Sequence, residues 1–171
     1  MEAKAKKSLG QNFLKDPEVL RSIVDIAEIH PGDRVFEIGP GTGALTEVLS
    51  SAGAHVLAVE LDRELVSRLS EHFIASDNVS ILEGNILDMH LEEMLTHAGY
   101  EHQQYKIVAN IPYYITAPII RTLLSLRSQA SSITLMVQDA VADRLTAAPG
   151  AQSLLSVMAQ YYADVEKKLF V

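Results

Sequence analysis

The amino-acid sequence predicts an α/β domain in which a doubly wound, mostly parallel sheet carries helices on both faces. From residue 17 onward, segments with the apolar spacing of helices alternate with short runs rich in valine and isoleucine. This alternation is typical of parallel strands joined by crossover helices. Of the 171 residues, 48% are hydrophobic and only 6% are aromatic, so one core of aliphatic side chains is expected.

Periodicity and end signals give the individual elements. Asp16 is a candidate cap for a first helix with Pro17 in its first turn, and residues 30–33 end that helix. Because the last predicted strand ends with the chain at an apolar edge, we expect the sequence to be part of a longer protein. The other predicted helices cover 42–52, 62–73, 91–97, 116–126, 139–145 and 154–162, and the predicted strands cover 34–38, 54–59, 79–82, 106–109, 133–137 and 165–171.

Charge divides the chain into two parts. The net charge is −8, yet residues 1–15 hold four lysines against one acid. We expect residues 1–15 to form a basic arm whose Lys4, Lys6 and Lys7 contact nucleic-acid phosphates, and residues 16–171 to form the main domain. A solvated tail is the alternative for the arm.

Several classes of protein are excluded by composition. The chain has no cysteine, so it has no disulfides and no thiolate metal site. Its six histidines lack the pairing of metal ligands, and we expect no metal. It shows neither a signal peptide nor an apolar run long enough for a membrane span. We therefore expect a cytoplasmic protein, and we expect it to be a monomer.

A glycine-rich loop is the most informative segment. The first predicted strand runs directly into Gly39, Gly41 and Gly43 at the start of a helix. Glycines let the backbone approach a ligand closely, and a helix start offers free N–H groups. Glu60, at the end of the second strand, is placed to accept hydrogen bonds from ribose hydroxyls, with Leu61 beside it.

The loop alone leaves two ligands open. Gly39-x-Gly41-x-x-Ala44 fits the fingerprint of a dinucleotide site. S-adenosylmethionine is favoured by the longer pattern E-x-G-x-G-x-G, in which a carboxylate at Glu37 can anchor the methionine end. After the third strand, Asn85 is placed to hydrogen-bond the edge of an adenine and Ile86 to cover its face.

Asn110-Ile111-Pro112-Tyr113, after the fourth strand, indicates the chemistry. An exocyclic adenine amine is a poor nucleophile because its lone pair is delocalised into the ring. Oδ1 of Asn110 and the carbonyl of Ile111 can hold its hydrogens and favour a more tetrahedral nitrogen. Pro112 stiffens the loop, and Tyr113 offers a face on which a flipped base can stack. We expect Asn110, Pro112 and Tyr113 to form the catalytic corner.

Taken together, the segments 8–14, 37–43 and 110–116, with Glu60, resemble the ribosomal RNA adenine dimethyltransferases over essentially the whole chain. The resemblance implies a Rossmann-like S-adenosylmethionine methyltransferase fold over 16–171. It also implies dimethylation of two adjacent adenosines near the 3′ end of small-subunit rRNA, in the pre-ribosomal small subunit. Family members continue past residue 171 with a last strand and a helical domain. The implied cofactor contacts are Gln11, Asn12, Leu14, Gly39, Glu60, Asn85 and Asn110.

Three positions, in two segments, depart from the family pattern. Asn85 stands where an aspartate is usual, and Asp139-Ala140 stand where a basic residue and a glutamate are usual. An amide accepts one hydrogen bond from the adenine amine but lacks the charge of a carboxylate. Two other functions stay open at this point, a nicotinamide-dependent oxidoreductase and a non-catalytic RNA-binding or assembly factor with the same fold.

Overall fold

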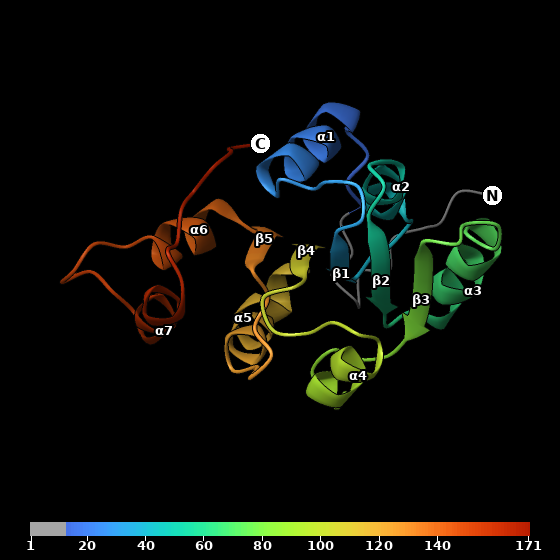
Figure 1. Cartoon of the computed structure of the whole chain (residues 1–171). Helices are drawn as coiled ribbons and strands as arrows, with labels where there is room; N and C mark the ends of the chain where they lie inside the picture. The colour runs from blue at the N-terminus through green and yellow to red at the C-terminus, as the bar shows by residue number, and fades with distance from the viewer. Residues whose placement is uncertain (1–12) are drawn as a thin grey trace.

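The computed structural model describes residues 13–171 and, at Tyr113, the backbone only. These residues form one sheet with helices on both faces (Figure 1). All strand pairings are parallel, in the order β3-β2-β1-β4-β5, which confirms the predicted doubly wound α/β class. The strands are β1 (Arg34–Ile38), β2 (His55–Glu60), β3 (Val79–Glu83), β4 (Lys106–Asn110) and β5 (Ser132–Met136).

Helices cover both faces of the sheet, and α6 and α7 lie beyond the edge strand β5 (Figure 1). Helices α1 and α2 pack on one face against alternate strand residues such as Val35 and Val56, while α4 and α5 pack on the other against Phe36 and Leu57. Both faces of these strands are thus buried, as is typical of a parallel sheet covered by helices on both sides. The helices are α1 (Pro17–Ile26), α2 (Ala44–Ser51), α3 (Arg63–His72), α4 (Leu91–His97), α5 (Thr116–Leu124), α6 (Asp139–Leu145) and α7 (Leu154–Tyr162), with the 3-10 turn η2 (Tyr113–Ile115).

Local signals in the sequence fix several helix ends. The Oδ1 atom of Asp16 accepts hydrogen bonds from the N–H groups of Glu18 at 2.8 Å and Val19 at 3.3 Å, as expected for a helix cap. Helix α2 begins at Ala44, two residues later than predicted. Its cap is Gly43 in the left-handed region with φ +86°, so the loop continues further than the helical period suggested.

The sixth strand predicted over 165–171 is wrong. Residues 164–171 have no regular structure and follow α7 past α6. A strand forms only where a neighbouring strand satisfies its backbone groups, and this segment pairs with none of the described strands. Its contacts are instead made by side chains, since Lys167 Nζ bonds both Asp139 and, at 2.9 Å, Asp143 of α6.

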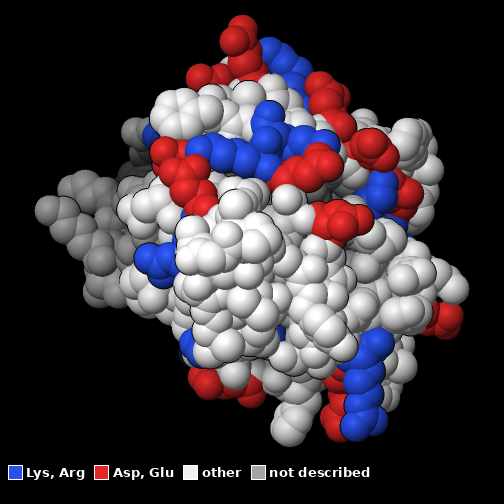
Figure 2. Space-filling view, turned by 90° about the vertical axis from the view of Figure 1, so that its left-hand side faces the viewer, with Lys and Arg blue, Asp and Glu red and all other residues white. Residues whose placement is uncertain are grey.

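The outer face of α7 is apolar. Leu154, Val157 and Tyr161, spaced along one side of the helix, are all exposed. Figure 2 shows this side of the molecule, where a broad uncharged area is bordered by mixed acidic and basic side chains. Among residues 13–171, no helix is both long and apolar enough to cross a membrane.

The central strand β1 carries an acid into the interior. Glu37 is 1% exposed, and Oγ1 of Thr46 on α2 donates to its Oε2 at 2.7 Å. Burial raises the pKa of this carboxyl to about 8, the Thr46 hydrogen bond acts in the opposite direction, and the charge of Glu60 adds to the rise. The folded chain therefore holds a proton on Glu37 at a pH where the unfolded chain has lost it.

We expect Glu37→Gln to stabilise the protein increasingly as the pH rises. Between about pH 4.5 and 8 the native state binds one proton more than the unfolded state, so the stability of the parent chain falls as the pH rises. The difference in unfolding free energy should grow by up to ~1.4 kcal/mol per pH unit and level off above about pH 8. Urea unfolding across this range measures it.

Glu71→Gln on α3 is the matched control, because that acid is exposed in the native structure. Its substitution should leave the pH profile unchanged. A Glu37→Gln profile parallel to that of the parent chain would contradict the assigned protonation.

Candidate active site

The glycine loop joins β1 to α2 with three glycines in the left-handed region. The φ angles are +66° at Gly39, +60° at Gly41 and +86° at Gly43. A Cβ atom at Gly43 would lie 2.7 Å from Leu69 Cδ2, and one at Gly41 would lie 3.1 Å from Phe13 Cδ1. Gly39 faces open space instead. Two of the glycines thus allow close packing, and the first leaves room for a ligand against the backbone.

Glu60 ties this loop to the end of β2. Its Oε2 accepts a hydrogen bond from the N–H of Gly41 at 3.0 Å, and its Oε1 accepts one from the N–H of Asp62 at 2.9 Å. The side chain is only 5% exposed. Each carboxylate oxygen has a further lone pair, so Glu60 can still accept hydrogen bonds from the hydroxyls of a sugar.

The corner after β4 is held from both sides. The N–H of Ile111 donates to the carbonyl of Met136 on β5 at 3.2 Å, and the Ile111 side chain is 1% exposed in the core. The carbonyl of Pro112 accepts hydrogen bonds at 3.2 Å from both the N–H of Ile115 and Oγ1 of Thr116. These contacts fix the path of the backbone directly after Asn110.

One pocket brings these segments together at the carboxyl ends of β1, β2, β3 and β4. Its lining is mostly apolar, with Glu37, Glu60, Asn85 and Asn110 among its polar groups. This composition suits a ligand with a flat apolar part and a few polar edges. The predicted site residues that line it are Leu14, Glu37, Gly39, Gly41, Glu60, Leu61, Asn85, Ile86, Asn110 and Pro112.

The remaining predicted residues are not placed at the pocket. Gln11, Asn12, Lys4, Lys6 and Lys7 lie outside the described residues, as does the side chain of Tyr113. The predicted basic arm is therefore described only from residue 13 onward. Their proposed roles in closing over a cofactor and in contacting RNA stay predictions.

Several pocket residues were missed from the sequence. Phe13 reaches the pocket from the chain start and packs with Leu69 and Phe73, and Tyr114 lines the pocket although it is 56% exposed. Thr46, the hydrogen-bond partner of Glu37, was also missed. The sequence carries only a weak signal for this role of Thr46, because the partner of a threonine within a helix is not known until the facing strand is known. Within residues 13–171, no group of three or more His, Cys, Asp or Glu side chains could hold a metal ion.

The arrangement limits the chemistry that the pocket can support. It contains two acids in an apolar setting, a backbone loop open at Gly39, and the Asn110 amide on the neighbouring strand. Buried carboxylates favour a ligand that carries positive charge or several hydroxyl groups. These features fit a nucleoside with a cationic tail.

Comparison with known proteins agrees with this geometry. The chain is similar to the "Ribosomal RNA small subunit methyltransferase A" of Pediococcus pentosaceus, with 43% identity over 98% of this chain and 59% of that protein. Among solved structures, it is similar to a dimethyladenosine transferase from Plasmodium falciparum (28% identity, TM-score 0.73, covering 87% of this chain and 52% of that one). It is also similar to the 23S rRNA methyltransferase ErmE (28% identity, TM-score 0.69, covering 87% and 57%).

The chain spans about three fifths of the length of the curated relatives it matches. The family model described as "Ribosomal RNA adenine dimethylase" matches residues 2–169, nearly the whole sequence. With the parallel sheet and the pocket at its carboxyl edge, this match identifies the chain as a member of the ribosomal RNA adenine dimethylase family.

Proposed function

We propose that this chain binds S-adenosylmethionine and forms the catalytic domain of an enzyme that methylates N6 of two adjacent adenosines in small-subunit rRNA, in the cytoplasm. The observation that carries the proposal is the single pocket shared by the glycine loop after β1 and the Asn110 corner after β4. A cofactor held by the first would lie beside a base held by the second. The curated relatives are named as methyltransferases of this RNA.

The chain's own residues supply binding and alignment. Glu60, which lines the pocket, would accept hydrogen bonds from the ribose hydroxyls, and the open backbone at Gly39 would leave room for the methionine part beside Glu37. When bound, the cofactor supplies a sulfonium methyl group, and its sulfide is a good leaving group. Oδ1 of Asn110 accepts a hydrogen bond from the adenine amine, which localises the nitrogen lone pair toward that methyl group. The proton lost from N6 after transfer goes to water.

Ligand preference separates the proposal from an oxidoreductase. Calorimetry should show binding of S-adenosylhomocysteine and no comparable binding of NAD. Glu60→Gln should weaken the S-adenosylhomocysteine complex by about tenfold, because it removes the charge from the hydrogen bonds to the ribose. Glu64→Gln, at an exposed acid on α3, is the control. Tighter binding of NAD than of S-adenosylhomocysteine would overturn the proposal.

Asn110→Ala tests the catalytic role. We expect methyl transfer to undermethylated small ribosomal subunits to fall by about 100-fold or more, because the amine loses its side-chain acceptor in the transition state. Binding of S-adenosylhomocysteine should change by less than about tenfold, since Glu60 and the glycine loop remain. Transfer of a tritiated methyl group measures the first quantity and calorimetry the second.

Gln152→Ala, at an exposed amide between α6 and α7, is the control for this substitution. Parent-like transfer by Asn110→Ala would rule out the assigned role. A parent chain that binds S-adenosylhomocysteine and the small subunit but labels no RNA would instead favour the non-catalytic assembly factor.

A further inference from the structure

The turn after β3 holds a hydrogen-bonded pair of polar side chains. Asn85 Nδ2 donates to Asp88 Oδ2 at 2.6 Å, and the N–H of Leu87 donates to Asn85 Oδ1 at 3.1 Å. The backbone N–H groups of Asp88 and Met89 both donate to the Asn85 carbonyl, at 3.0 and 3.1 Å. Both ends of the Asn85 amide are therefore fixed, the amino group by a carboxylate and the oxygen by a backbone donor.

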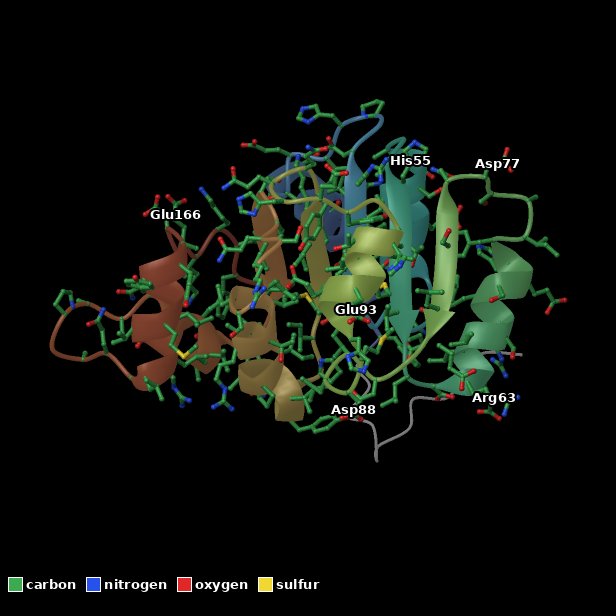
Figure 3. The ribbon with its side chains drawn as sticks, turned by 60° about the horizontal axis from the view of Figure 1, so that its bottom comes forward. His55, Arg63, Asp77, Asp88, Glu93 and Glu166 are labelled. Atoms are coloured by element: carbon green, nitrogen blue, oxygen red, sulfur yellow. The ribbon has the colours of Figure 1, made fainter. Side chains whose placement is uncertain are left out.

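Apolar contacts hold this turn against the body of the domain. Ile86 is 5% exposed in the core between the sheet and α4, and a Cβ atom at Gly84 would lie 2.6 Å from Met89 Sδ. Asn85 lines the pocket, whereas Asp88 is exposed and is not among the lining residues. Figure 3 shows Asp88 at the carboxyl edge of the sheet, the edge at which the pocket lies.

The orientation of the Asn85 amide decides which purine it favours. A freely rotating amide presents either a donor or an acceptor, so it would bind a 6-amino or a 6-oxo purine. An ionised carboxylate only accepts hydrogen bonds, so Asp88 engages the amino side of the amide. The oxygen is then the acceptor, and it has a second lone pair beyond the bond from Leu87.

We propose that Asp88 is a positioning residue for recognition of the cofactor's adenine. By holding the Asn85 amide in one orientation, it makes Asn85 Oδ1 the acceptor for the 6-amino group and excludes a 6-oxo group. Asp88 acts through Asn85 and does not contact the ligand. This inference rests on the proposed binding of S-adenosylmethionine.

Calorimetry with two ligands tests it, S-adenosylhomocysteine and its inosine analogue, which carries a 6-oxo group. In Asp88→Ala we expect the Kd for S-adenosylhomocysteine to rise about fivefold and the preference over the inosine analogue to fall about tenfold. The loss is partial because the N–H of Leu87 still favours the same orientation. Asp77→Ala is the matched control, since it removes the same exposed charge at the other end of β3 (Figure 3).

Exchanging the amide and the carboxylate between residues 85 and 88 provides a second, independent test. Asn85→Asp alone places two carboxylates side by side and should weaken binding. The double variant Asn85→Asp with Asp88→Asn should bind S-adenosylhomocysteine more tightly than Asn85→Asp, because it removes the repulsion between the two carboxylates. It should keep the preference for adenine, because a carboxylate at residue 85 accepts from the 6-amino group and repels the 6-oxo group.

The outcomes are distinct. An unchanged preference in Asp88→Ala, or an equal loss of affinity for both ligands, would overturn the positioning role and leave the proposed function intact. A parent chain that binds neither ligand would overturn the proposed function together with this inference. Melting temperatures of all variants verify that the turn still folds.

Discussion

The parallel pairing of β1 with β4 is the constraint on which the site depends. Their register, with Ile38 opposite Ala109, places the ends of the two strands side by side. The chain leaves β1 toward α2 and β2 on one side of the sheet, and it leaves β4 toward α5 and β5 on the other. At such a reversal of strand order the loops diverge and a crevice opens between them. The glycine loop and the Asn110 corner form the two walls of this crevice.

Two nearly buried acids line this crevice. Glu37 and Glu60 lie on neighbouring strands and both are nearly buried, so ionising both costs free energy unless a positive charge or hydrogen-bond donors approach. Glu60 is already held by the backbone N–H groups of Gly41 and Asp62, whereas Glu37 has a single hydroxyl partner in Thr46. Burial is the largest cause of the raised pKa of Glu37, the Thr46 hydrogen bond acts against it, and the charge of Glu60 adds to it. A cation that approached Glu37 would favour the ionised form of its carboxyl.

The sequence predicted a doubly wound, mostly parallel sheet but not its full strand order. It did locate most of the helices and strands. Helices α4, α6 and α7 match their predicted bounds because their apolar periods and end signals are local. The segment 165–171 was predicted as a strand because its composition suits one. A strand also needs a partner, and a partner is a property of the whole sheet that composition does not reveal.

The pocket could be predicted to a similar extent. Gly39, Glu60, Asn85 and Asn110 were predictable because each lies at or just after the end of a strand, and parallel strands end at a common edge. Residues that act through other residues were not. The Thr46 hydroxyl and the Asp88 carboxylate carry no motif, and they reach Glu37 and Asn85 only after the helix and the turn have formed.

Buried apolar side chains beside the polar residues hold the loops at this edge of the sheet in a defined geometry. Ile86 and Ile111, each next to a polar pocket residue, are buried in the same core between the sheet and the helices α4 and α5. A loop that has a side chain anchored in the core loses less further entropy when it binds a ligand. The packing of these apolar neighbours therefore positions the backbone at Asn85 and Asn110, while hydrogen bonds orient the Asn85 amide. A substitution that reshapes this core would move both amides together, although it would alter neither of them directly.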